Sequence, residues 1–302
     1  MLPFFDAGPP LAAAMTALYG LLAATSLSVK VAARGAAPGM LSHQVNAWWR
    51  IFPLVTLALL AYPLGLQALA WLVCLLAARE LDAHHPGRRT ALRLGAAAVA
   101  LGLAGVGWAW PTLVLPLAGA AAGIQLLRYR LRPDAARLVW LLLLAAAGAM
   151  QVVVAFAALP FGARANLAWL FYLFILTALN DIGQFVAGKL FGRHRIAPTV
   201  SPNKTWQGLA GGIVVSQVVS AALGAWLDLA GAATMAAFGL LLSLAGFAGD
   251  LLFSRAKRRL SIKDFSQLIP GHGGILDRVD SLVLTAPLLY CLLRTLVQGT
   301  PS

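Results

Sequence analysis

The sequence predicts an all-α integral membrane protein, a polytopic bundle of about nine to ten transmembrane helices. Of its 302 residues, 60% are hydrophobic and 11% are charged, whereas soluble globular chains carry about 45–50% apolar and roughly 25% charged residues. The apolar residues form blocks of about 15–25, a length that crosses a bilayer as a helix. Lys and Arg fall almost entirely between these blocks. This composition excludes a disordered chain, a secreted disulfide scaffold and an ordinary cytosolic enzyme.

Ten apolar blocks are predicted to span the membrane. No basic segment precedes the first block, so we interpret it as a retained span and not as a cleaved signal. The second and third blocks are separated only by Pro63 and Gly65, and one tilted helix in their place would give nine spans. The ten predicted spans cover residues 11–29, 51–65, 67–81, 91–108, 111–127, 138–158, 166–187, 208–227, 232–252 and 281–298.

The positions of the basic residues support ten spans and predict their orientation. When the spans alternate in direction, one set of connections with its adjoining span ends holds 21 of the 23 Lys and Arg. Only Arg164 and Arg294 lie on the other side. Because cationic loops stay in the cytoplasm, we expect both termini to be non-cytoplasmic. The connections predicted to be cytoplasmic are residues 30–50, 82–90, 128–137, 188–207 and 253–280.

The two halves of the chain differ in chemistry. Residues 1–160 are mostly apolar, and we expect them to be structural and to contain the surface for any dimer. Within them, residues 140–150 are nearly all Leu and Ala, which is typical of a lipid-facing helix. Residues 161–302 hold the reactive side chains and are expected to be catalytic. The cytoplasmic loops explain the net charge of +13 without nucleic acid, and anionic lipid or a polyphosphate would also suit this charge.

Four aspartates of the second half, in or next to its apolar blocks, are candidates for function. Asp181 and Asp250 are costly in a membrane unless they are paired, hydrated or bound to metal, so both are functional candidates. Asp277 and Asp280 are three residues apart, and this spacing places them on one helix face. Neighbouring carboxylates repel each other unless a cation lies between them. Mg²⁺ is the expected cation because it binds one or two carboxylates together with phosphate oxygens.

Basic and hydrogen-bonding side chains accompany these carboxylates. They suit phosphate binding, although positive cytoplasmic loops would show the same charges. Glycines around His272 allow the backbone to approach a ligand and to donate from its N–H groups. From the residues alone, the chain is an integral membrane enzyme or transporter that handles a phosphorylated substrate with Mg²⁺. The candidate phosphate-binding residues are Ser201, Lys204, Thr205, Lys257, Arg258, Arg259, Lys263, Gly273 and Gly274.

The segment 254–280 resembles the signature of the phosphatidate cytidylyltransferases, also called CDP-diacylglycerol synthases. The similarity covers roughly residues 165–300 and extends upstream to Asn180-Asp181 and to Ser201-Pro202-x-Lys204-Thr205. Residues 1–160 match only as a hydrophobic region, with Arg79-Glu80-Leu81 faintly similar. The signature positions keep their spacing and are Ser254, Lys257, Arg258, Lys263, Asp264, Ser266, Pro270, His272, Gly273, Gly274, Asp277, Arg278 and Asp280.

Several positions depart from the family pattern. The segment Asp181-Ile182-Gly183-Gln184-Phe185 stands where the family usually has Asp-Ser-Gly-Ala-Tyr, and Phe253 stands where Glu is common. These changes bear on the lipid substrate or the metal site more than on the reaction. They leave open a different acceptor, namely another lipid phosphate or a polyprenyl phosphate.

The resemblance implies transfer of CMP from CTP to phosphatidic acid, which gives CDP-diacylglycerol and pyrophosphate. It also implies Mg²⁺ bound by Asp250, Asp277 and Asp280. Roles in positioning and charge neutralisation are implied for Lys257, Arg258, Lys263, His272 and Arg278. Substrate contacts are implied for Ser201, Lys204, Thr205, Ser254, Gly273, Gly274, Asp181 and Asp264.

The implied partners are CTP from water and phosphatidic acid from the bilayer, and a homodimer is implied by the family alone. The Ala- and Arg-rich composition is compatible with a high-GC bacterium, which predicts the inner membrane with the active site on the cytoplasmic side. A transporter of a phosphorylated solute is an alternative of another class, but transporters often show inverted repeats and none is evident. A third alternative is an inactive homologue that serves as a scaffold.

Overall fold

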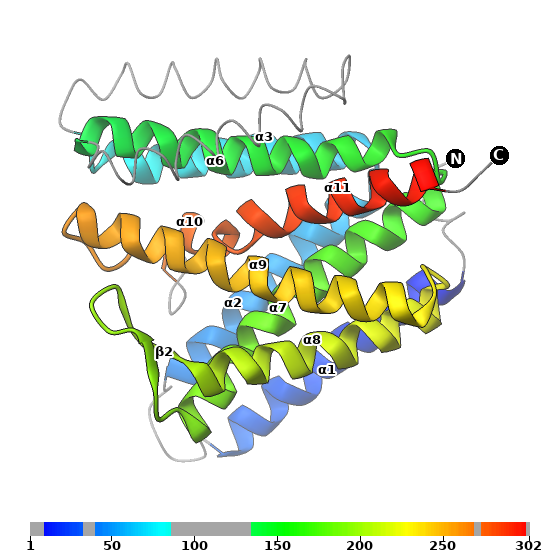
Figure 1. The fold of residues 1–302 in the computed structure, drawn as a ribbon, viewed down its shortest axis with the longest axis horizontal. Helices are drawn as coiled ribbons and strands as arrows, with labels where there is room; N and C mark the ends of the chain where they lie inside the picture. Colours follow the sequence, from blue (N-terminus) through cyan, green and yellow to red (C-terminus); the bar gives the residue numbers. More distant parts are fainter. Residues whose placement is uncertain (1–8, 33–39, 86–133, 269–272, 300–302) are drawn as a thin grey trace.

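The computed structural model describes residues 9–32, 40–85, 134–268 and 273–299, and within them the chain is almost entirely helical. Long helices form a bundle, and a short hairpin projects from one end of it (Figure 1). The elements are α1 (Pro9–Ala32), α2 (Met40–Leu60), α3 (Leu64–Asp82), α6 (Ala135–Ala155), the 3-10 turn η1 (Phe156–Ala158), α7 (Ala163–Phe191), β1 (Arg195–Ala197), β2 (Ser201–Thr205), α8 (Trp206–Leu227), α9 (Ala232–Arg259), α10 (Leu276–Val279) and α11 (Leu282–Gly299).

Seven helical segments of the described chain are long and apolar enough to cross a membrane. This confirms the predicted all-α membrane class. An eighth apolar segment, Val45–Leu60 of α2, is shorter. Together they correspond to eight of the ten predicted spans. The other two, 91–108 and 111–127, lie outside the described residues.

The second and third predicted spans are separate helices. α2 ends at Leu60, and the N–H of Gly65 donates to the Ala61 carbonyl oxygen at 2.7 Å to close the turn into α3. A side chain at Gly65 would overlap the backbone carbonyl of Ala58. α2 begins at Met40, well before the predicted residue 51. Hydropathy marks only where a helix is apolar, whereas helical hydrogen bonding continues through the polar residues that precede the apolar part.

The prediction that residues 140–150 face lipid is wrong. They lie in α6, and 89% of the residues in its most apolar stretch are buried within the molecule. Among residues 141–150 only Leu144 is exposed. α6 packs beside α3 and α11 (Figure 1). A helix that is apolar all round fits a protein interior as well as lipid, and its many Ala residues let neighbouring helices approach closely.

The two ends of the bundle carry different charge. In Figure 1 the start of α1 and the end of α11 lie at one end, and the hairpin and the α9–α10 connection lie at the other. Trp226 at the end of α8 donates to the Pro10 carbonyl oxygen at 3.0 Å, which joins α8 to the start of α1. At the opposite end the ring of His84 hydrogen-bonds with the Phe265 carbonyl oxygen at 2.9 Å. The described basic connections are therefore gathered at one end, as the alternation predicts.

Candidate active site

Charged residues from distant parts of the sequence meet at this basic end of the bundle. α7, β2, α9 and α10 each contribute, and the end of α3 joins them. Two ion pairs organise the arrangement: one closes the segment 254–280 on itself, and the other ties the hairpin to α9. The sequence predicted these residue types but not which of them would pair.

Asp277 holds the segment 254–280 together. Its Oδ1 lies 2.6 Å from Lys257 Nζ, and its Oδ2 accepts from the N–H groups of Gly274 at 2.9 Å and Phe265 at 3.4 Å. The Lys257 and Asp277 side chains are only 12% and 6% exposed. Charge-assisted hydrogen bonds of this kind are the strong ones. Both oxygens of Asp277 are therefore occupied by donors from the protein itself.

The second ion pair joins β2 to α9. Lys204 Nζ lies 2.5 Å from Asp250 Oδ2, and the Lys204 side chain is largely buried. The same ammonium group lies 4.5 Å from the centre of the Phe247 ring. Ser254 Oγ donates to the other oxygen of Asp250 at 3.2 Å. The hairpin residue Lys204 is thus brought to Asp250 and Ser254, which lie one turn apart on α9.

Lys204→Met is expected to lower any activity of this site at least about tenfold, because it leaves Asp250 without its cation and unties the hairpin from α9. Turnover and thermal unfolding of the purified variant would measure the effect. Lys30→Met is the matched control, because Lys30 is exposed at the end of α1. If Lys204→Met kept full turnover, the ion pair would have no part in function.

A second group of carboxylates surrounds Ser281. Ser281 Oγ donates to Asp181 Oδ1 at 3.1 Å, and its N–H donates to Asp280 Oδ1 at 2.8 Å. The Asp280 side chain is buried. The negative charges of Asp250 and Asp181 repel that of Asp280, and the positive charges of Lys257 and Arg278 attract it. The region is locally negative and is bordered by cations.

Oxygen ligands for Mg²⁺ are present here, but not as the predicted trio. In the described ranges no group of three or more His, Cys, Asp or Glu side chains is arranged to hold a metal ion. Asp277 is buried and accepts from three donors of the protein. Asp250 is also paired, with Lys204, but it is partly exposed, and its negative charge repels that of Asp280. Mg²⁺ commonly takes only one or two protein carboxylates and completes its shell with water and phosphate oxygens. Asp250 and Asp280 fit that requirement, because a divalent cation relieves their mutual repulsion.

Two predicted substrate or catalytic residues make structural bonds. Thr205 Oγ1 accepts from the Gly208 N–H at 3.0 Å and so caps α8. Arg258 donates from Nε to the Val200 carbonyl oxygen at 3.1 Å and from Nη1 to the Ile262 carbonyl oxygen at 3.2 Å. It thereby links the hairpin turn to the residues after α9. Ser201 stands opposite Ala197 across the hairpin.

The two glycines of the predicted phosphate-binding turn lie directly before α10. Gly273 has φ of +78°, which favours glycine. The N–H of Gly274 donates to Asp277 Oδ2 at 2.9 Å. Three other predicted residues, Lys263, Asp264 and Arg278, are exposed. His272 lies outside the described residues.

Glu80 is the residue that sequence reasoning missed. It lies near the end of α3, in the half expected to be structural, and it is only 5% exposed. Its Oε1 accepts from Ser266 Oγ at 2.6 Å and from the Ile275 N–H at 2.7 Å, and its Oε2 accepts from the Leu276 N–H at 3.1 Å. The carboxylate thus caps α10 and fixes the loop before it. The Arg79-Glu80-Leu81 similarity was the only signal that pointed to it.

Of the positions that depart from the family pattern, Gln184 is polar and half-buried, whereas Ile182, Phe185 and Phe253 are apolar. Ile182 and Phe185 are 42% and 51% exposed on the outer side of α7. Phe253 is buried, and its ring centre lies 6.2 Å from that of Phe265, the residue whose N–H donates to Asp277. The apolar side chain at position 253 therefore packs behind the Asp277 loop.

Comparison with known proteins gives consistent matches. A model of the cytidylyltransferase family matches residues 42–296. The chain is 41% identical over 129 residues to the phosphatidate cytidylyltransferase of Staphylococcus aureus (strain COL), which covers 42% of this chain and 50% of that protein. It is 42% identical over 123 residues to the uncharacterized protein YnbB of Escherichia coli (strain K12), which covers 41% of each. The matched segment spans half or less of these curated relatives.

Proposed function

The chain belongs to the cytidylyltransferase family, and we propose that it transfers CMP from CTP to phosphatidic acid. The products are CDP-diacylglycerol and pyrophosphate. The observation that carries this proposal is the buried Lys257–Asp277 ion pair beside the Lys204–Asp250 pair. Together they place cations and carboxylates at the end of a membrane bundle, where a lipid phosphate and a soluble triphosphate can both arrive.

The reaction needs little covalent chemistry from the protein. An oxygen of the lipid phosphate attacks the α-phosphorus of CTP, the bond from that phosphorus to the bridging oxygen breaks, and pyrophosphate leaves with the electron pair. The lipid phosphate is already anionic at neutral pH, so no strong general base is required. The protein's contribution is therefore positioning and neutralisation of charge, as in other phosphoryl transfers.

The residues take their roles from where they lie. Lys204 and Lys257 are nearly buried cations beside the carboxylates, and we assign them to the phosphates of the bound substrates. The exposed Lys263 and Arg278 are suited to the outer phosphates of CTP. Arg258 and Thr205 hold the hairpin in place, and Ser201, Ser254 and Asp181 are candidate hydrogen-bonding partners of the substrates. His272 remains a candidate donor and Asp264 a candidate contact.

We propose Mg²⁺ as the cofactor, held by Asp250 and Asp280. Asp250 would exchange its ion pair with Lys204 for the metal, and Asp277 could join only by releasing Lys257. The ion would supply neutralisation of the triphosphate and of the leaving pyrophosphate. Asp181 lies close enough to Asp250 for their negative charges to repel each other. It is a neighbouring hydrogen-bond acceptor in the site.

The surroundings of the reaction are proposed from the family and the charge pattern. The chain is an integral membrane protein, and we propose the bacterial inner membrane with the basic end of the bundle in the cytoplasm. Phosphatidic acid would enter from the leaflet and CTP from water. We also propose a homodimer, which rests on the family alone.

Pyrophosphate release by the full chain in detergent tests the reaction. We expect release only when CTP, Mg²⁺ and phosphatidic acid are all present, and loss of release when EDTA removes the metal. A parallel series with other lipid phosphates and polyprenyl phosphates tests the acceptor. Release with one of these acceptors and not with phosphatidic acid would contradict the substrate assignment. No release from folded protein with any lipid phosphate would contradict the proposed reaction itself.

A further inference from the structure

A pocket at the end of α7 lies outside the residues assigned to the reaction. It has a volume of about 420 Å³ and is lined by Leu190, Phe191, Gly192, Arg193 and Gln207. Four of these residues come from the end of α7 and the turn after it, and Gln207 comes from the first turn of α8. Its volume falls within the range of about 300–1,000 Å³ that is usual for small-molecule sites.

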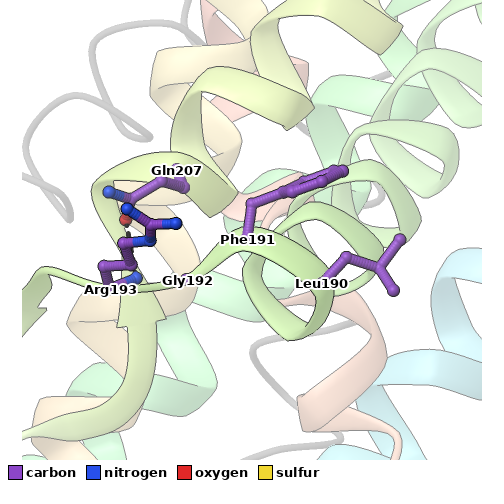
Figure 2. A pocket seen from close by; sticks show the side chains of 5 residues that line it. All are labelled: Leu190, Phe191, Gly192, Arg193 and Gln207. Carbon is purple, nitrogen blue, oxygen red and sulfur yellow. Dashed lines mark hydrogen bonds between the residues drawn. The ribbon is translucent and has the colours of Figure 1, made fainter.

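The walls of this pocket are apolar on one side and polar on the other. In Figure 2 the side chains of Leu190 and Phe191 lie on one side of Gly192, and those of Arg193 and Gln207 lie on the other. Leu190 and Phe191 are 67% and 65% exposed. Trp206, next to Gln207, is also exposed, and Trp is enriched where the membrane meets water. The pocket is therefore amphipathic, and the exposed Trp206 beside it suits a boundary between bilayer and water.

The polar wall is fixed before any ligand arrives. Gln207 Oε1 accepts from the N–H groups of Arg193 at 3.1 Å and His194 at 3.2 Å. A side chain at Gly192 would overlap the carbonyl oxygen of Gly188, so the turn packs tightly against the preceding helix. A preformed wall lowers the entropy cost of binding.

Positive charge is not balanced at this wall. The sequence contains no Asp or Glu between residues 182 and 227, while Lys189, Arg193 and Arg195 lie within seven residues of one another. Lys204 of the hairpin is neutralised by Asp250. The Arg193 guanidinium, in contrast, makes no hydrogen bond or ion pair with the described residues. A guanidinium presents a planar set of donors that matches phosphate oxygens.

We propose that this pocket binds a non-reacting anionic phospholipid of the bilayer. Its phosphodiester group would contact Arg193, and its acyl chains would lie along Leu190 and Phe191. A soluble phosphate would use the polar wall and leave the apolar wall in water, so the amphipathic shape favours a lipid. The pocket adjoins the hairpin that carries Lys204, and an occupant would steady that hairpin.

Lipid binding by the full chain in detergent, without CTP, tests this proposal independently of the reaction. Native mass spectrometry would count bound phosphatidylglycerol, with phosphatidylcholine and inorganic phosphate as comparison arms, and thermal unfolding would report stabilisation. Arg193→Gln is the test variant. Arg164→Gln is the matched control, because Arg164 is exposed at the other end of the same helix. Leu190→Asn tests the apolar wall separately.

We expect Arg193→Gln to weaken phosphatidylglycerol binding about tenfold, Leu190→Asn to weaken it less, and Arg164→Gln to leave it unchanged. Phosphatidylcholine should bind poorly to all four proteins. Equal phosphatidylglycerol binding by the native chain and Arg193→Gln would overturn the proposal. So would stabilisation by inorganic phosphate as large as that by phosphatidylglycerol, because the site would then bind a soluble anion.

Discussion

Replacing Asp277 by Asn is expected to lower pyrophosphate release by about 100-fold or more and to lower the free energy of unfolding by about 3–5 kcal/mol. Asp277 and Lys257 form an ion pair with both side chains nearly buried. Asn removes the negative charge and leaves the Lys257 ammonium unpaired in a low-dielectric environment. One carboxylate oxygen is also replaced by an NH₂ group, and the single remaining oxygen cannot accept from both Lys257 and the Gly274 N–H.

Steady-state pyrophosphate release and thermal unfolding in detergent would measure these effects. Asp228→Asn is the matched control, because Asp228 is exposed at the C-terminal end of α8. Its φ of 51° is a left-handed conformation that Asn also adopts readily. Full turnover by Asp277→Asn would remove this carboxylate from the proposed mechanism.

The double variant Lys257→Met/Asp277→Leu separates stability from activity. Replacing a buried ion pair with apolar side chains of similar volume is often neutral or stabilising. We therefore expect the double variant to unfold at a higher temperature than Asp277→Asn and to remain inactive. Restored turnover would show that the pair serves only the fold. A raised Mg²⁺ requirement in the residual activity of Asp277→Asn would support the direct metal role predicted from the sequence.

The membrane class could be predicted from the sequence because hydropathy reports on each helix alone. Blocks of apolar residues, together with alternating basic connections, identify the helices and the end of the bundle that gathers charge. The environment of α6 could not be predicted in this way. Its Leu- and Ala-rich surface suits both lipid and the interior, and only the positions of α3 and α11 decide between them.

The site could be predicted as a set of residue types but not as a set of pairs. The family signature predicted Lys257, Asp277 and Asp280 as site residues, and all three lie at the same end of the bundle. The spacing of Asp277 and Asp280 suggested a shared metal ion, whereas Asp277 pairs with Lys257 from the preceding helix. Such a contact depends on how α9 and α10 are oriented, which periodicity within one helix does not reveal.

Glu80→Gln is expected to lower pyrophosphate release by about 10–100-fold through loss of loop positioning. Glu80 touches none of the reacting groups, so it is a positioning residue. Its buried carboxylate accepts three hydrogen bonds, from Ser266, Ile275 and Leu276. Gln keeps the size of the side chain, but it removes the charge and turns an NH₂ group toward at least one donor. Two donors that face each other in a buried site cost about as much free energy as a buried polar group without a hydrogen-bond partner.

Hydrogen exchange distinguishes positioning by Glu80 from a general effect on the fold. If the carboxylate fixes α10, the Ile275 and Leu276 amides should exchange faster in Glu80→Gln, while amides in the middle of α9 and α11 keep their protection. The loop orients Asp277 but forms only part of the nucleotide site. We therefore expect kcat to fall by a larger factor than the KM for CTP rises. Glu80→Asp, which keeps the charge on a shorter side chain, should recover part of the activity.

Unchanged exchange at Ile275 and Leu276 together with normal turnover would mean that Gln satisfies the same donors and that the charge of Glu80 is dispensable. Faster hydrogen exchange across the whole bundle would instead mean that Glu80 stabilises the entire fold. α3 would then pack against the site without orienting it.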